Sequence, residues 1–283
     1  MSNPNIDNES LESFIQAILD KKLSAKEAIS QSFSKDLNLA YAGVYIIGYT
    51  ALIVNKEGNP SVIPVDWINV QNVPNPNTLL ENFLINLANH SLAVINLIES
   101  GYDFSARIIL RALLELSWIA IYVVADRNTM QMYAQDLDDE SERKMYNQLF
   151  GWGKLRTNLS RIEKNLEMPN DIVDVLSRAR NHAYKYYSQI VHNSYPVVTI
   201  GAYGYSLEKD KTLEFGLFGV LSAGSKQTLY NLNEAIFYFI GMLSQVFVRV
   251  YGLQPTHSAD WQEFFGLRRD FSNAFFEYAK EDG

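Results

Sequence analysis

The feature that most constrains this fold is the segment Asp103–Ala125, which is apolar on nearly every side of a helix. Such a helix is normally buried, because its apolar surface would otherwise face water on all sides. The preceding pattern, Thr78–Glu99, ends at Ser100-Gly101, a typical helix stop. Two long helices joined by so short a turn form an antiparallel hairpin. The rest of the chain must therefore supply the elements that cover this hairpin.

Helical patterns account for most of the remaining chain. Two capping boxes, Ser24 with Glu27 and Thr78 with Glu81, mark helix starts. The other predicted helices are Ser10–Lys21, Tyr41–Val54, a polar helix from Asn128 to about Phe150, Lys154–Glu167, Asp171–His192, Ser225–Tyr251 and Ser258–Lys280. We therefore predict a mainly all-α fold, a multi-helix bundle of antiparallel helices.

Residues 196–220 differ from this helical pattern. They are rich in glycine, aromatic and β-branched residues, which favour strands and turns. We expect a small β-hairpin or ordered loop inserted there. Residues 1–75 form an N-terminal helical segment and loop, and residues 76–283 form the helical bundle domain. We expect these two parts to make one continuous domain.

Composition excludes several classes of protein. The chain has 283 residues, 47% of them hydrophobic, and no cysteine, which rules out disulfides, thiol nucleophiles and cysteine-bound metals. The net charge of −8 is opposite in sign to that of proteins that coat nucleic acid. The first twelve residues are polar and show no signal sequence. We expect a cytoplasmic protein with no membrane association, and no cofactor or metal, since the four histidines lack metal-site spacing.

Three charged residues interrupt the apolar segment. Arg107, Arg111 and Glu115 follow each other at four-residue spacing, so they line one side of the helix. A buried charge needs a partner, and Arg111 can pair with Glu115. The group is interpreted either as a structural ion pair that sets helix register or as the wall of a polar cleft that meets an anionic ligand.

A polar stripe follows one side of the predicted helix Asp171–His192. At 100° per residue, its members fall within about one third of the circle: Arg178, Asn181, His182, Lys185, Ser188, Gln189 and His192. Such a stripe can act on a phosphodiester without metal. His192 would transfer a proton near neutral pH, Lys185 or Arg178 would hold the phosphate, and Asn181 and Ser188 would orient the groups. The alternative is a solvated or interface face, which amphipathic patterning also predicts.

Two short motifs carry a family resemblance. Arg111-Ala-Leu-Leu-Glu115 and Ser188-Gln-Ile-Val-His192 resemble the R-x-L-L-E and S-x-x-V-H signatures of an uncharacterised bacterial helical family. That family is similar to HEPN-type domains, many of which are metal-independent ribonucleases of toxin–antitoxin and phage-defence systems. The resemblance implies a homodimer and a catalytic histidine at His192. In those nucleases four to six residues separate an arginine from the histidine, whereas here the residue separated from His192 by six others is Lys185, which lacks the bidentate fork of arginine.

Two functions follow as hypotheses. The first is a HEPN-like endoribonuclease with His192, Lys185, Ser188 and Asn181 in catalysis, supported by Arg178 and His182 and by Arg107, Arg111 and Glu115 from the neighbouring helix. The second is a non-catalytic helical module that binds a protein partner or senses a ligand. Homodimerisation is expected with either, and RNA is the expected substrate of the first.

Overall fold

The computed structural model describes residues 8–68, 75–191, 203–205, 213–215 and 219–282. Almost all of this part is helical, which confirms the all-α class. His192, the predicted catalytic residue, lies outside the described residues.

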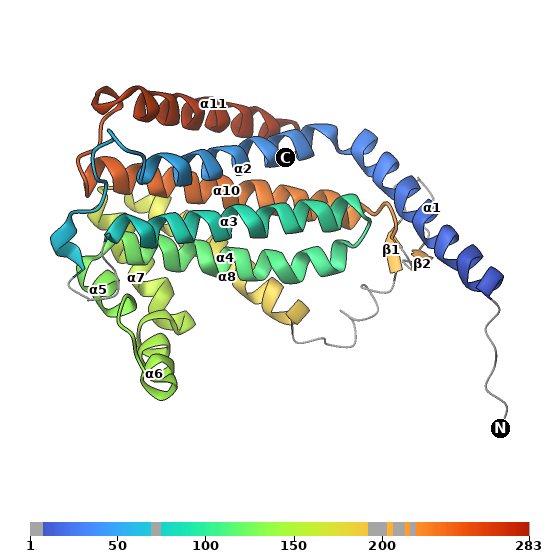
Figure 1. The fold of residues 1–283 in the computed structure, drawn as a ribbon, viewed down its shortest axis with the longest axis horizontal. Helices are drawn as coiled ribbons and strands as arrows, with labels where there is room; N and C mark the ends of the chain where they lie inside the picture. The colour runs from blue at the N-terminus through green and yellow to red at the C-terminus, as the bar shows by residue number, and fades with distance from the viewer. Residues whose placement is uncertain (1–7, 69–74, 192–202, 206–212, 216–218, 283) are drawn as a thin grey trace.

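Four long helices form the central bundle, and their apolar faces meet in one continuous core. They are α2 (Ser34–Val54), α3 (Pro76–Glu99), α4 (Asp103–Ala125) and α10 (Ala223–Arg249). Each packs mainly against two of the others, in the cyclic order α2, α3, α4, α10, and α3 also contacts α10 (Figure 1). The C-terminal helix α11 (Ala259–Asp282) covers the outer side of α2 and α10. The apolar helix of the sequence is thus enclosed, as predicted.

The turn between α3 and α4 is built around one glycine. Gly101 has a φ of +77°, which residues with a Cβ rarely adopt. Its amide donates to the carbonyl of Ile98, and its carbonyl accepts from the amide of Val220, just before α10. Gly101 therefore closes the hairpin and joins it to the start of α10, which brings the three helices together at this end.

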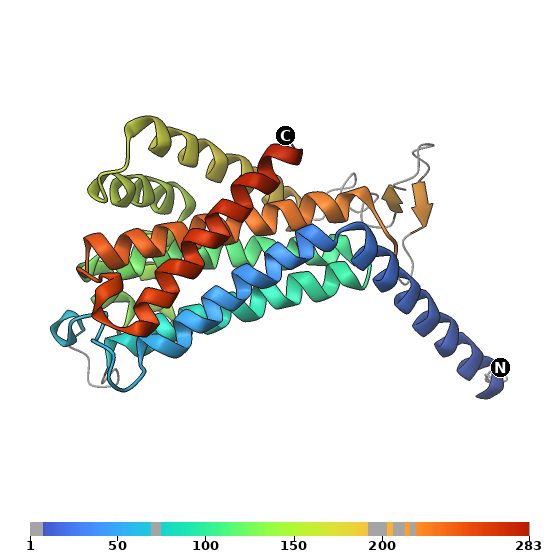
Figure 2. The ribbon, with the colours of Figure 1, turned by 90° about the horizontal axis from the view of Figure 1, so that it is seen from above.

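A second layer of helices lies against α4. It contains α5 (Arg127–Tyr133), α6 (Asp139–Phe150), α7 (Trp152–Asn165) and α8 (Asn170–Val191), and it projects from one side of the bundle (Figure 2). The single polar helix predicted from Asn128 to Phe150 is wrong, because two helices occupy this stretch. Asp138 starts the second by accepting a hydrogen bond from the Ser141 amide at 2.9 Å.

The N-terminal helix α1 (Asn8–Ser32) projects from the end of the bundle as an arm (Figures 1 and 2). It runs through Ser24, so the predicted helix start there is wrong: no glycine or proline interrupts the chain at Ser24. The second capping box also misplaces a start, since Asn75 caps α3 and Pro76 opens it. In both cases the backbone is already helical at the predicted N-cap residue, at Ser24 within α1 and at Thr78 two residues after the start of α3.

Only two short strands are described in the region expected to hold an insertion. β1 (Tyr203–Tyr205) and β2 (Leu213–Phe215) pair antiparallel, with Gly204 opposite Glu214. Most of 196–220 lies outside the described residues, so the prediction of an inserted hairpin across that range stays a prediction.

Two of the described helices, α2 and α4, are long and apolar enough to cross a membrane. Core helices of soluble proteins share these properties, and 61% of each apolar stretch is buried inside the bundle. The expected absence of membrane association therefore stays a prediction.

Candidate functional site

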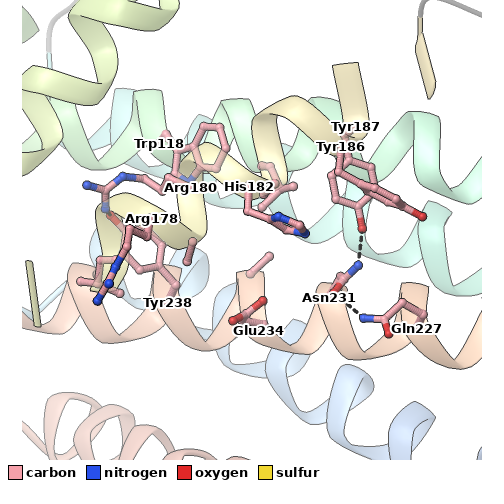
Figure 3. A pocket seen from close by; sticks show the side chains of 15 residues that line it. Trp118, Arg178, Arg180, His182, Tyr186, Tyr187, Gln227, Asn231, Glu234 and Tyr238 are labelled. Carbon is pink, nitrogen blue, oxygen red and sulfur yellow. Dashed lines mark hydrogen bonds between the residues drawn. The ribbon is translucent and has the colours of Figure 1, made fainter. Parts of the chain in front are cut away.

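A cavity of about 690 Å³ opens between α8 and α10, over the middle of α4. Its walls are mostly apolar and carry four aromatic rings, those of Trp118, Tyr186, Tyr187 and Tyr238. Figure 3 shows α8 on one side and α10 on the other, with polar side chains reaching in from both. The volume and the mixture of apolar walls with a few polar groups are typical of small-molecule sites.

Glu234 of α10 is the acidic side chain that lines this cavity. Its side chain is accessible because it faces the open cavity, but the surrounding walls displace much of its hydration. This loss of hydration raises the pKa of the Glu234 carboxyl, and nearby His182 counteracts it in part. No hydrogen bond or ion pair reaches Glu234 from the described residues. Its carboxylate is therefore open to a donor on a ligand.

His182 reaches into the cavity from α8 and faces the side that carries Glu234 and Asn231 (Figure 3). The imidazole stacks parallel to the ring of Tyr186, with centroids 6.4 Å apart and planes at 8°. The Tyr186 hydroxyl in turn accepts a hydrogen bond from Arg107 Nη1 at 2.8 Å. These contacts tie the His182 ring to α4 through Tyr186.

A chain of amides fixes the opposite wall. Gln227 Nε2 donates to Asn231 Oδ1 at 3.0 Å, and Asn231 Nδ2 donates to the Tyr187 hydroxyl at 2.6 Å (Figure 3). Burial raises the pKa of Tyr187, so its hydroxyl stays protonated at neutral pH. This network bridges α10 and α8 at one end of the cavity and positions both helices.

A buried ion pair holds the other end of the cavity. Arg180 of α8 is 3% exposed and pairs with Glu163 of α7, which is fully buried. Arg180 Nη2 donates to Glu163 Oε2 at 2.9 Å, and the Tyr238 hydroxyl donates to Glu163 Oε1 at 3.1 Å. Three helices thus converge on one carboxylate. Because Arg180 is neutralised by Glu163, it adds little net charge to the cavity.

The predicted stripe on α8 is divided by the structure. Arg178 and His182 line the cavity, but Asn181, Lys185 and Ser188 are not among its lining residues. Asn181 accepts a hydrogen bond from Arg156 of α7 at 3.2 Å, Lys185 is exposed, and Ser188 is half-buried. The division arises because α7 packs against one side of α8 and the cavity occupies another.

The three charged residues of α4 also have separate surroundings. Arg107 pairs with Asp103 at 2.7 Å and donates from Nε to Thr228 of α10 at 3.1 Å. Arg111 and Glu115 form the expected pair, at 3.2 Å. None of the three lines the cavity.

Arg111 belongs instead to an aromatic stack between α4, α7 and α8. Its guanidinium lies over the ring of Tyr184, 4.5 Å from the centroid, and Tyr184 stacks on Trp152 at 3.9 Å. Trp152 also contacts Trp118, with centroids 5.3 Å apart. This stack places Trp118 at the base of the cavity.

A second hollow, of about 490 Å³, lies between α7 and α8. Its lining is basic and rich in hydroxyl groups: Arg156, Thr157, Ser160, Arg161, Lys164, Asn165 and Ser177. Arg161 is paired with Asp126 at 3.3 Å, and Arg156 is bonded to Asn181. The described residues contain no group of three or more metal-ligating side chains, here or elsewhere.

Sequence reasoning missed the α10 wall of the cavity. Glu234 is the one acidic residue in the segment Ala223–Arg249, where an isolated charge in an apolar helix is a recognisable signal. Asn231 and Gln227 precede it by one and two turns on the same side. Comparison of the chain with protein-family models, with curated proteins and with solved structures finds no match.

Proposed function

We propose that the protein is a ligand-binding helical module whose cavity between α8 and α10 takes a small organic amine with an apolar or aromatic body. The observation that carries this proposal is Glu234, a carboxylate without a protein partner among the described residues, in a cavity walled by aromatic rings. An ammonium group would replace the lost hydration of Glu234, and the rings would attract the same cation through their faces.

The position of the cavity suits a sensing role. α8 ends at Val191 and α10 begins at Ala223, so the two walls flank segment 192–222 in the chain. A ligand that contacts both walls favours one spacing of α8 and α10 over others. It can shift a conformational equilibrium only by its difference in affinity for the two arrangements.

Three matched probes test the ligand class: phenethylamine, 2-phenylethanol and phenylacetate, which share a ring and differ in charge. We expect the amine to raise the melting temperature most and the carboxylate least. The affinity of the amine, measured by calorimetry, should exceed that of the carboxylate at least tenfold, about 1.4 kcal/mol. Equal binding of all three, tighter binding of the carboxylate, or no binding would each refute the proposal.

Variants assign the binding to this cavity. Glu234→Gln should remove the preference for the amine while the chain stays folded. Glu277→Gln is the matched control, because Glu277 is an exposed carboxylate on α11, paired with Lys280. An unchanged preference in Glu234→Gln would place any amine binding elsewhere.

RNA cleavage at His192 is the second candidate function, and the basic hollow between α7 and α8 favours it. Arg156 and Lys164 line that hollow beside the hydroxyls of Ser160 and Ser177, a combination that suits phosphate oxygens. Lys185 lies further along α8 toward His192. In this proposal the protein is a metal-independent endoribonuclease of a toxin–antitoxin or phage-defence system.

One variant at each site separates the candidates. His192→Ala should abolish cleavage of a single-stranded RNA and leave amine binding intact, whereas Glu234→Gln should weaken amine binding and leave RNA cleavage intact. Cleavage that survives in His192→Ala would exclude the nuclease proposal.

A further inference from the structure

The projecting arm α1 carries a row of exposed apolar side chains. Leu11, Ile15, Leu19 and Leu23 follow each other at four-residue spacing and are between 46% and 58% exposed. The arm first becomes buried in the bundle at Ala25 and Ile29, where it meets α2 and α3. A helix that leaves four large apolar side chains in water normally has another surface to meet.

We propose that this row is the contact between two copies of the chain, whose α1 arms pair antiparallel. Rows of four-residue spacing form ridges that interlock between helices. The row is complementary to itself in the antiparallel sense: when Ile15 of one copy lies opposite Leu19 of the other, Leu11 lies opposite Leu23. This reciprocity is what a two-fold symmetric contact requires.

Charge along the arm selects the antiparallel direction. The outer part, residues 8–19, has a net charge of −2 from Glu9 and Glu12. The part near the bundle, residues 20–27, has a net charge of +1, from three lysines and two acids: Lys21, Lys22, Lys26, Asp20 and Glu27. Antiparallel pairing places the acidic end of each arm beside the basic end of the other. Parallel pairing would place the acidic outer parts of the two arms beside each other, which is unfavourable.

The position of the bundle gives a second, steric reason. The centre of the row lies twelve residues from Ile29, or about 18 Å along the helix. In a parallel pair crossing at about 50°, the two Ile29 positions would be only about 15–20 Å apart. Two packed helices are already about 20 Å wide, so the two bundles would collide. Antiparallel arms place the bundles at opposite ends of the contact.

Sedimentation velocity of the full chain from about 1 to 100 µM tests the pairing. A contact of one helix on another is at or below the lower size of specific interfaces, about 1,200 Å² in total, so we expect dimerisation within this concentration range. Leu19→Asp should raise the dissociation constant at least about tenfold, because each dimer would then bury two carboxylates without partners. Leu52→Asp is the control, since Leu52 is 76% exposed on α2, away from the arm. A monomer at every concentration, or an equal effect of both variants, would overturn the proposal.

Cross-linking tests the direction of the arms. The chain has no cysteine, so single introduced cysteines report one contact each. A mixture of Leu11→Cys and Leu23→Cys should form the mixed disulfide on mild oxidation, and Leu11→Cys alone should remain largely uncross-linked. A Leu11→Cys homodimer that forms faster than the mixed one would show that the arms are not antiparallel.

Discussion

The ion pair between Glu163 and Arg180 gives the sharpest test of how the cavity is held. Glu163→Gln keeps the shape of the side chain but leaves the Arg180 guanidinium buried without a countercharge. Arg180 is 3% exposed and Glu163 fully buried, so water cannot replace the lost partner. Breaking a buried pair in this way costs about 3–5 kcal/mol. We expect a melting temperature lower by roughly 6–20 °C, at about 2–4 °C per kcal/mol for a chain of this size.

A matched surface pair provides the control. Glu167 follows α7 and pairs with Arg249, and both side chains are largely exposed. Glu167→Gln should therefore change the stability by less than about 1 kcal/mol. Equal effects of Glu163→Gln and Glu167→Gln, in urea unfolding followed by circular dichroism, would refute the claim that burial decides the cost.

The double variant Glu163→Leu/Arg180→Met separates the missing partner from the loss of the pair itself. Replacing both charges by apolar groups of similar volume is often close to neutral. We expect the double variant to recover most of the stability lost in Glu163→Gln. A double variant as unstable as the single one would mean that the surrounding network, including the Tyr238 hydroxyl, requires the charges.

Three further predictions rest on single contacts. Gly43→Ala should lower the free energy of unfolding, measured in urea, by about 1–3 kcal/mol, because its Cβ would lie 2.5 Å from Ile236 Cγ2. Gly48→Ala on the same helix should raise the free energy of unfolding by about 0.5–1 kcal/mol, because its Cβ would enter open space. Gly101→Ala should cost more than about 1 kcal/mol by the same assay, since φ is +77° and the Cβ would meet the Val220 nitrogen at 2.4 Å; a neutral result would disprove a rigid turn. The melting temperature of Glu234→Gln should be higher than that of the wild type at pH 7 and equal to it below pH 4.5. Burial raises the pKa of Glu234 above its ordinary value of 4.5, so the folded state binds this proton more tightly than the unfolded state does. The wild type therefore loses stability as the pH rises through the raised pKa. A Glu234→Gln melting temperature below that of the wild type at pH 7 would contradict this sign.

Local signals predicted which segments are helical better than where those helices begin. The hairpin of α3 and α4 was predictable because Ser100-Gly101 stops one helix and Gly101 alone supplies the positive φ of the turn. The capping boxes failed as boundary signals. A serine followed three residues later by glutamate starts a helix only where the preceding backbone leaves the helical conformation, and at Ser24 it does not.

Of the two helices that wall the cavity, only α8 could be identified from the sequence. The polar stripe identified α8, but an amphipathic helix shows which residues avoid the core and not which of them face water, a neighbouring helix or a cavity. Asn181 and His182 are consecutive, yet the first binds Arg156 of α7 and the second enters the cavity. Helix geometry turns the two side chains about 100° apart, but what each one meets depends on how α7 and α10 are placed around α8, and that placement depends on contacts between residues distant in the chain.

By itself, the sequence determined that this chain forms antiparallel helices around the buried segment Asp103–Ala125, because hydrophobic periodicity and helix-stopping residues act over short distances. Tertiary structure alone decided that α10 faces α8 across a cavity and that Glu234 and His182 share it. Those residues are 52 positions apart, and only the packing of both helices on α4 brings their side chains into the same space.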